Sequence, residues 1–299
     1  MKNLKDLTVI ILTYHTPKKI IFDCLKSIDR NTNILIVENS SIFVHHKEVL
    51  TGFPHVRIIC TGKNLGYGAG NNLGIKNTKT DYALILNPDV ICHEDFFSNI
   101  PFVINEAKDF VIIGCQYLFD KIFMPAGFFN KKKNNEFVEN FKINKVNSLS
   151  KVEWVTGCSM LLNLKEFENR DIFDENFFLY FEEFDLCKSM IKAGKNVYTS
   201  NQLKIHHLGF KSSVSENHNE NLKKTNIKNW HYMWSSFYFY KKNYNYLYAL
   251  NKILWKFIKS FFKMIFYSIT FQKEAKQKYL YRFLGLLSSI LGRTSNFRG

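Results

Sequence analysis

The stretch LILNPDV, residues 84–90, decides the fold class of this 299-residue chain. Its apolar half predicts a strand that is covered on both faces, because buried parallel strands are continuously apolar. Pro88 then ends the strand, since proline has no N–H to donate to a sheet. Asp89 is therefore expected at the carboxyl edge of a sheet, where open α/β folds bind ligands. An ordinary turn is the simpler interpretation of Asn87, Pro88 and Asp89 taken alone.

Strand-like and helix-like runs alternate on both sides of this stretch. Such alternation predicts an α/β fold with βαβ units and a mostly parallel sheet. The expected strands are 8–13, 34–37, 56–60, 82–86, 110–115 and 152–162, the last interrupted at Gly157, and the expected helices are 17–29, 66–76, 93–107 and 182–193. Residues 120–150 are polar, charged and aperiodic, which predicts a mobile loop over one edge of the site.

Positive charge is concentrated at one end of the chain. The sequence has 41 Lys and Arg against 26 Asp and Glu, a net charge of +15. Residues 223–299 hold fifteen of these bases and one acid, Glu274, so they carry +14 and residues 1–222 carry about +1. A nucleic-acid-binding body is disfavoured, because the charge lies outside it. We expect an α/β domain over 1–222 and a basic, aromatic, helical extension over 223–299.

Cysteine usage and the N-terminus bear on the compartment. The six cysteines include no CxxC pair, so reduced thiols are expected rather than disulfides or a metal cluster. The apolar run at 7–12 is too short for a signal peptide or a membrane span, and we expect it to be the first strand.

Residues 250–266 predict a helix with a wide aromatic face and a lysine stripe. Its four lysines recur at spacings of four, three and four, which places them on one side of an α-helix. They are Lys252, Lys256, Lys259 and Lys263. Such a helix is typical of an anionic membrane surface, which we expect it to contact through residues 245–270 without spanning the bilayer. A helix packed on the body, with its lysines in water, is the open alternative.

Two segments of the first half carry candidate binding residues. Glu38 ends an expected strand, where an acid can accept hydrogen bonds from a ribose or a base. Gly66, Gly68 and Gly70 open a helix and allow the backbone to approach an anion such as a diphosphate. The glycines alone are a weak signal, because the lysine of a P-loop is missing and the segment does not follow the first strand.

Acids and histidines in the second half are candidates for chemistry. Glu182, Glu183 and Asp185 begin a helix behind an aromatic run, and apolar walls raise a carboxyl pKa in a way that suits a general base. Capping of the helix is the alternative explanation for these acids. His206 and His207, expected just after a strand, are a modest indication of a metal ligand.

Seven segments together resemble the bacterial family 2 glycosyltransferases, most closely the rhamnosyltransferase-like branch that builds cell-surface polysaccharides such as lipopolysaccharide or capsule. The segments lie between about residues 7 and 215, in the order and spacing of the family. They are TYHTP, VENSS, NLGYGAGNN, LILNPDV, WVTGCSMLL, FDENFFLYFEEFDLC and HHLGFKSS. The resemblance implies the Rossmann-like GT-A fold and inversion at the anomeric carbon. It also implies a dTDP- or UDP-linked sugar donor and a divalent metal, Mg²⁺ or Mn²⁺.

The resemblance further implies roles for single residues. Asp89 takes the place of the family's DxD motif and binds the metal, and His207, or else His206, completes that shell. Glu183 stands where the family has a catalytic Asp, with Glu182 as the alternative base. The donor side comprises Thr13, Tyr14, Glu38, Asn64, Gly66, Asn87 and Asp89, and the acceptor side comprises Trp154, Thr156, Gly157 and Asp185.

These inferences predict an inverting glycosyltransferase that is peripheral on the cytoplasmic face of a bacterial membrane. It is expected to move a sugar, with rhamnose as the first candidate, to a lipid-linked oligosaccharide. Two alternatives stay open, a nucleotidyltransferase and a non-catalytic nucleotide-sugar-binding relative. For the first, the segment TYHTPKK is a poor phosphate loop.

Overall fold

The computed structural model describes residues 4–117, 126–142, 148–209 and 218–298. The chain divides into two compact units. Unit 1 comprises Met1–Leu65, Ala69–Phe173 and Leu186–Ser213, and unit 2 comprises Gly66–Gly68, Asp174–Asp185 and Val214–Gly299. The domain boundary expected after residue 222 stays a prediction.

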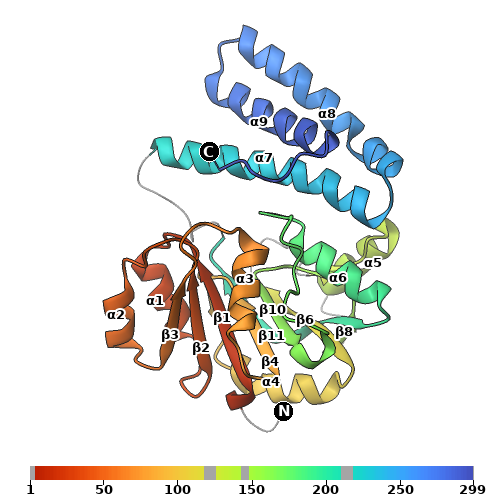
Figure 1. The fold of residues 1–299 in the computed structure, drawn as a ribbon. Coiled ribbons are helices and arrows are strands. Elements are labelled where there is room, and N and C mark those ends of the chain that lie inside the picture. The colour runs from red at the N-terminus through yellow and green to blue at the C-terminus, as the bar shows by residue number, and fades with distance from the viewer. Residues whose placement is uncertain (1–3, 118–125, 143–147, 210–217, 299) are drawn as a thin grey trace. The chain divides into compact units, whose positions relative to one another are not determined.

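A large mixed sheet forms the centre of unit 1 (Figure 1). Within the described ranges it has nine strands in the order β3-β2-β1-β4-β10-β6-β11-β5, with β8 paired to β11. The strands are β1 (Leu7–Thr13), β2 (Asn33–Glu38), β3 (Val56–Cys60), β4 (Tyr82–Leu86), β5 (Val90–Cys92), β6 (Phe110–Tyr117), β8 (Leu149–Lys151), β10 (Ser159–Asn163) and β11 (Asn196–His207). Strands β1 to β4, β6 and β11 run in one direction and the other three run against them, so the prediction of a mostly parallel sheet is confirmed.

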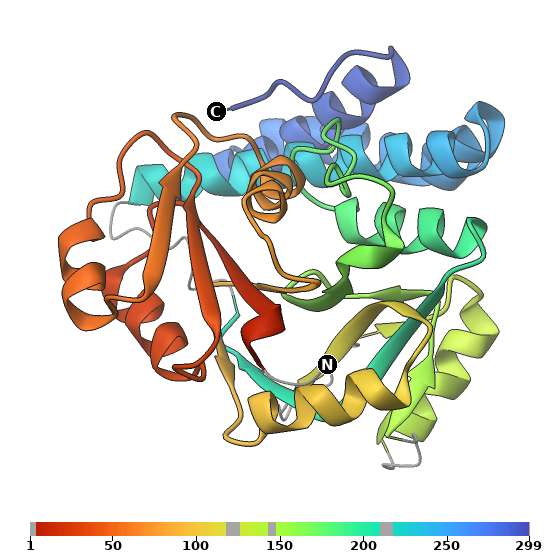
Figure 2. The same ribbon diagram turned by 60° about the horizontal axis from the view of Figure 1, so that its bottom comes forward.

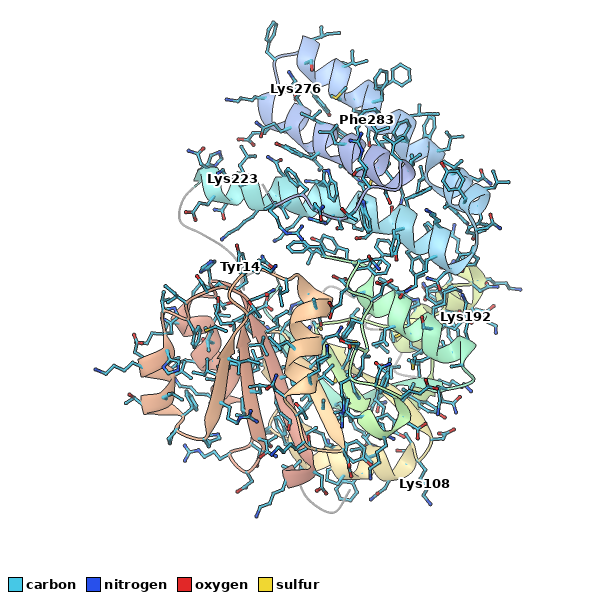
Figure 3. All side chains as sticks on the ribbon, viewed as in Figure 1. Tyr14, Lys108, Lys192, Lys223, Lys276 and Phe283 are labelled. Atoms are coloured by element: carbon cyan, nitrogen blue, oxygen red, sulfur yellow. The ribbon has the colours of Figure 1, made fainter. Side chains whose placement is uncertain are left out.

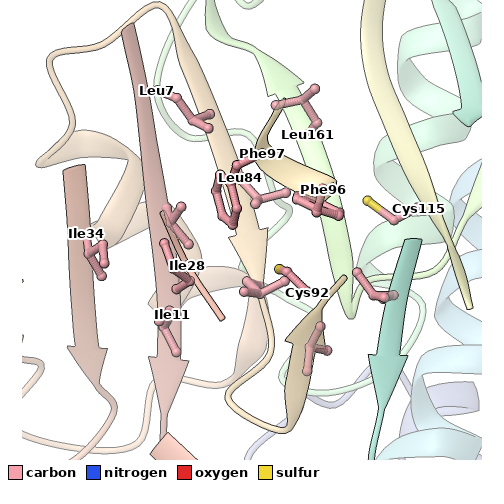
Figure 4. Close-up of a cluster of buried hydrophobic side chains, with 14 of the residues drawn as sticks. Leu7, Ile11, Ile28, Ile34, Leu84, Cys92, Phe96, Phe97, Cys115 and Leu161 are labelled. Carbon is pink, nitrogen blue, oxygen red and sulfur yellow. The ribbon is translucent and has the colours of Figure 1, made fainter. Parts of the chain in front are cut away.

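Helices cover both faces of this sheet (Figure 2). On one face, α1 (Lys18–Lys26), α2 (His46–Gly52) and α4 (Phe96–Glu106) contribute to a continuous apolar core with alternate residues of β1. Figure 4 shows part of that core, where Leu7 and Leu84 of the strands lie with Phe96 and Phe97 of α4. Burial of these side chains is the main stabilising contribution, at about 25 cal/mol per Å² of apolar surface.

Helix α3 (Tyr67–Lys76) belongs to unit 1 from Ala69 onward. This part of the helix packs on the other face of the sheet. A Cβ on Gly70 would lie 2.5 Å from Cδ1 of Leu12, and one on Gly74 would lie 2.6 Å from Cγ2 of Ile10. Both distances are shorter than a van der Waals contact, so these two glycines are needed for close packing of the helix on β1.

Several elements differ from the expected ones. Helix α2 was not predicted, and the expected strand at 152–162 is divided into β9 (Trp154–Val155) and β10, with β9 paired to β7 (Ala126–Gly127). The prediction of a mobile loop over 120–150 is wrong for residues 131–142, which form helix α5 (Lys131–Lys142), while residues 120–125 and 143–147 lie outside the described ranges. Helix α6 (Glu182–Lys192) agrees with the expected helix at 182–193, and it ends before Gly194, whose φ of +77° is typical of a helix C-terminus.

Unit 2 is mainly helical, and the expected helical C-terminal region is confirmed. Its long helices are α7 (His218–Asn243), α8 (Tyr246–Ile269) and α9 (Lys273–Ile290). They enclose a small core of Met233, Phe237, Ala249, Ile253 and Leu286. The last residues return along α7 (Figure 1). The two ring nitrogens of His231 on α7 bond to Oγ of Ser295 at 2.9 Å and to the carbonyl of Phe297 at 2.8 Å.

Candidate functional site

One edge of the sheet in unit 1 collects most of the predicted donor residues. Thr13 ends β1, Glu38 ends β2, Asn87 follows β4, and His207 ends β11. Because these strands run in the same direction, their carboxyl ends meet at a single edge. The start of antiparallel β10 reaches the same edge, since the backbone N–H of Asn87 donates to the carbonyl of Cys158 at 2.9 Å.

The stretch at 84–90 is both a buried strand and a turn. The N–H of Val90 donates to the carbonyl of Asn87 at 3.1 Å, which closes a β-turn with Pro88 in its second position. This turn delivers Asp89, whose side chain is only 2% exposed. Asp89 therefore lies at the expected carboxyl edge of the sheet, but its side chain is covered by protein in this conformation.

The two histidines lie at different places, although they are neighbours in the chain. Both belong to β11 rather than following it, and successive side chains of a strand point to opposite faces. Nε2 of His207 is 3.4 Å from Oδ1 of Asp89. His206 instead lines a shallow pocket with Ile91 and His93. A carboxylate beside an imidazole is a donor set that a divalent cation can use, and the pair that fits is Asp89 with His207.

Glu38 is enclosed by protein donors. Its carboxylate accepts from Oγ1 of Thr13 and Oγ of Ser40, both at 2.6 Å, and from the N–H of His15 at 3.3 Å. Only 1% of Glu38 is exposed. This placement does not suit the predicted direct bond to a nucleoside, and it suits a residue that holds the loop after β1. Tyr14, on that loop, is exposed (Figure 3).

The segment around Gly66 is held by hydrogen bonds to a side chain and by close packing. In unit 1, the Asn39 side chain donates to Oδ1 of Asn64 at 3.1 Å and accepts from the N–H of Leu65 at 2.9 Å. In unit 2, Gly66 has φ +92°, and a Cβ there would lie 2.8 Å from Cδ2 of Phe178. Gly66 is therefore required by its conformation and by a close neighbour. Since Gly70 serves helix packing, the predicted anion cradle has no support from that glycine.

The predicted acceptor residues of unit 1 are divided between the core and the surface. Trp154 is buried on β9, where it pairs with Gly127. Thr156 and Gly157 are partly exposed in the connection between β9 and β10.

The aromatic segment before the acids has an unusual backbone. Tyr180 and Phe181 have φ values of +72° and +73°, in the left-handed region that L-residues seldom adopt. Each such residue costs about 1–3 kcal/mol, and such strain clusters at functional sites. The carbonyl of Phe181 accepts from the N–H of Asp185 at 2.9 Å, so the strained pair leads directly into the first turn of α6.

Helix α7 and the C-terminal residues hold this segment within unit 2. Oγ of Ser235 donates to the carbonyl of Leu179 at 2.9 Å. The Phe178 ring lies with its centroid 4.6 Å from that of His231 and 3.6 Å from the guanidinium carbon of Arg298. Contacts of this density can maintain the left-handed backbone that follows.

Asp185 is engaged by α7 as well. Its buried carboxylate accepts from Nζ of Lys242 at 2.6 Å and from Nδ2 of Asn243 at 2.7 Å, and Lys242 also bonds to Asp174 at 2.7 Å. We therefore assign Asp185 to positioning the segment rather than to the acceptor. Sequence reasoning missed Lys242 and Asn243, since they are 57 and 58 residues from Asp185 and no local pattern marks them.

The two glutamates differ in their surroundings. Glu182 is buried, and among the described residues its Oε1 has no hydrogen-bond partner. Burial, together with the charge of Glu183, raises the pKa of Glu182 well above its ordinary value. Glu183 is half-buried, and desolvation raises its pKa from 4.5 to about 7.

Comparison with known proteins identifies the family. The profile of the family described as "Glycosyl transferase family 2" matches residues 8–185. The hexosyltransferase Agl10 of low-salt glycan biosynthesis in Haloferax volcanii is 25% identical over 207 residues, covering 65% of this chain and 64% of that protein. The rhamnosyltransferase WbbL of Escherichia coli K12 is 26% identical, covering 60% of this chain and 74% of that protein. An N-acetylglucosaminyl-diphospho-decaprenol L-rhamnosyltransferase of Mycobacterium tuberculosis is 25% identical, covering 60% and 67%.

A solved structure shares the fold. The crystal structure of GalNAc-T7 with UDP, GalNAc and Mn²⁺ superposes with a TM-score of 0.52 at 11% identity, covering 85% of this chain and 57% of that chain. The fold prediction is confirmed: the chain has a GT-A-like, mostly parallel sheet flanked by helices and followed by a helical region. Because the family profile matches more than half of the chain, the chain belongs to the family 2 glycosyltransferases.

Proposed function

We propose that this protein is an inverting glycosyltransferase that moves a sugar from a nucleoside diphosphate to a lipid-linked saccharide in surface polysaccharide synthesis. The observation that carries the proposal is Asp89, a buried carboxylate delivered by a turn to the carboxyl edge of the sheet and set beside His207. Rhamnose is the first candidate sugar, because two of the relatives are named rhamnosyltransferases. The cytoplasmic face of the membrane is the proposed location.

The donor side is proposed at the carboxyl edge of unit 1. The exposed ring of Tyr14 offers an apolar surface for a nucleobase, and Glu38 keeps the Tyr14 loop in place through Thr13 and His15. The side chains of Asn87 and Asn64 are polar groups at the same edge or next to it, suited to the ribose or the diphosphate.

Asp89 and His207 are the residues that would hold a divalent cation, Mg²⁺ or Mn²⁺. The fit rests on the 3.4 Å approach of carboxylate and imidazole at the strand ends. When bound, such an ion offsets the negative charge that develops on the departing nucleoside diphosphate. The GalNAc-T7 structure, which shares the fold, contains Mn²⁺, so a divalent cation is compatible with a fold of this kind.

Glu183 is the proposed catalytic base. It accepts the proton of the acceptor hydroxyl while that oxygen forms a bond to the anomeric carbon and the bond to the diphosphate breaks on the opposite side, which inverts the configuration. A pKa of about 7 keeps a large fraction of Glu183 ionised at neutral pH. Glu182 is the weaker candidate, because its burial disfavours the ionised form that a base needs and raises its pKa well above the ordinary value.

The alternatives predict different products. A nucleotidyltransferase would release diphosphate from a nucleoside triphosphate, and a non-catalytic relative would bind a donor without turnover. Membership of family 2 favours sugar transfer over both.

The test is a transfer assay with the full chain, a panel of dTDP-, UDP- and GDP-sugars, Mn²⁺, and a polyprenyl-diphosphate-linked N-acetylglucosamine as acceptor. We expect one donor to yield a glycosylated lipid whose new anomeric centre, read by NMR, is inverted. A product with retained configuration would contradict the inverting mechanism. Donor binding without any product, across acceptors of this class, would support the non-catalytic alternative.

A further inference from the structure

Helix α8 carries a row of large apolar side chains on its outer surface. Six of them are more than half exposed: Leu247, Leu254, Trp255, Phe262, Phe266 and Ile269. They follow one another at intervals of 7, 1, 7, 4 and 3 residues, which places them on one face of an α-helix. We call these six residues the α8 stripe.

The opposite side of α8 is already packed. Ala249, Ile253 and Ser260 are buried, and the first two belong to the core that α8 shares with α7 and α9. The α8 stripe is therefore not the inner face of the helical unit. Contiguous apolar surface of this kind marks an interaction site.

Charge distinguishes between possible occupants of the stripe. Helix α8 has four lysines and no acid, and residues 223–299 carry +14. Two of the lysines, Lys252 and Lys259, are exposed and border the stripe. The other two contact neighbouring helices of unit 2: Lys256 lies 5.8 Å from the ring centroid of Tyr232 on α7, and Lys263 bonds to the hydroxyl of Tyr279 on α9 at 3.2 Å.

We propose that the α8 stripe lies in the headgroup region of a bilayer that contains anionic phospholipids, with Lys252 and Lys259 on its polar margin. Aromatic and aliphatic side chains flanked by lysine are the composition of helices that lie in a membrane interface. A second copy of this chain is a poorer occupant, because two stripes of equal positive charge repel each other. Across the described ranges no helix is both long and apolar enough to cross a bilayer, which is compatible with a helix that lies on the surface.

The contacts inside unit 2 connect this surface to the acidic segment. Helix α8 packs on α7, and α7 holds residues 174–185 through Ser235 and Lys242. Attachment of α8 to lipid would therefore fix that segment at the membrane. The lipid proposal does not rest on the proposed transfer reaction, since lipid binding is measured without donor or acceptor.

The chain provides its own probe for the test. Of its four tryptophans, Trp255 is 72% exposed, whereas Trp154, Trp230 and Trp234 are buried. Vesicles of phosphatidylcholine with about one third phosphatidylglycerol should shift the emission of the full chain to shorter wavelength, and pure phosphatidylcholine should do so much less. The variant W255F keeps the apolar surface and should lose the shift while still sedimenting with the anionic vesicles.

Matched variants separate the apolar and charged contributions. W255S/F262S should weaken sedimentation with anionic vesicles more than tenfold, whereas F102S, at an exposed Phe on α4 of unit 1, should not. K252E/K259E should weaken sedimentation with anionic vesicles by at least about fivefold per lysine. K131E/K132E on α5 changes the net charge by the same amount and should weaken this sedimentation much less.

Two outcomes would overturn the proposal. One is sedimentation with anionic vesicles that W255S/F262S leaves unchanged. The other is an emission of Trp255 that depends on protein concentration in the absence of vesicles, which would assign the stripe to self-association. Loss of sugar transfer in a variant that still sediments normally would bear on the proposed function alone.

Discussion

Nζ of Lys242 lies 2.6 Å from Oδ2 of Asp185, and this ion pair joins helix α7 to the first turn of α6. The family profile ends at residue 185, so one partner of the pair lies outside the matched region. The C-terminal helices are therefore part of the support for the acidic segment, and not only an appendage. Partial burial disfavours the charged form of Lys242, yet Asp174 and Asp185 outweigh it and hold its pKa above the usual value.

Replacing Lys242 tests this support. K242M should lower the free energy of unfolding by about 1–3 kcal/mol, because the Asp185 carboxylate is left buried with one partner fewer. K241M is the matched control, since Lys241 is the exposed neighbour on the same helix, and it should change stability by less than about 0.5 kcal/mol. Urea denaturation of both variants measures the difference. Equal stability of the two would contradict the role of Lys242.

Glu183 predicts how the protein responds to pH. Its folded-state pKa of about 7 exceeds the ordinary 4.5, so the folded state holds a proton that the unfolded state releases. The associated stability is complete below about pH 4.5 and is lost as pH rises through about 7. Transfer activity should rise over the same upper range, because only the ionised carboxylate can accept a proton.

Two variants test whether Glu183 or Glu182 causes this pH dependence. E183Q should remove the activity and flatten the fall of the melting temperature between about pH 5 and 8. E182Q should retain activity and raise stability above neutral pH, because it removes a buried ionisable group. Loss of activity in E182Q together with retention in E183Q would exchange the two roles.

Gly66 and Gly62 form a natural pair for testing local packing. Both have positive φ, +92° and +79°, but a Cβ on Gly66 would meet Phe178, whereas one on Gly62 has nothing within 4 Å. G62A should cost about 1 kcal/mol from its backbone conformation alone. G66A should lower the free energy of unfolding by about 1 kcal/mol more than G62A, because overpacking against Phe178 adds to the cost of its backbone conformation. Thermal unfolding of the two variants measures the difference. Equal costs would show that the Phe178 contact is not rigid.

Much of the fold could be predicted because its strands are marked locally. Uninterrupted apolar runs such as 82–86 end in turn residues, and β3 and β4 have the predicted bounds. Helix α5 was missed, since a polar segment such as KKKNNEFVENFK has too few apolar residues for a clear helical period. Helix α2 is only seven residues long, which is too short for periodicity to identify.

The candidate site could be predicted only as a set of residues. The resemblance placed Asp89 and His207 in one shell, and the pairing of Val90 with His207 brings them within 3.4 Å. Burial could not be foreseen, so Glu38 was expected to bind a nucleoside, although three protein donors surround it. The bonds from Lys242 and Asn243 to Asp185 depend on packing between distant segments, and no spacing in the sequence encodes such contacts.

The measurement that tests the central claim most directly is the melting temperature of the chain with UDP, dTDP, GDP or CDP, each with and without Mn²⁺. A ligand at 100 times its dissociation constant adds about 2.7 kcal/mol of stability, which a melting curve resolves. We predict that one nucleotide stabilises the protein only when the metal is present, and that D89N, which keeps the size of the side chain, abolishes this effect. A cooperative melt that none of the four nucleotides shifts, or a full metal-dependent shift in D89N, would contradict the account.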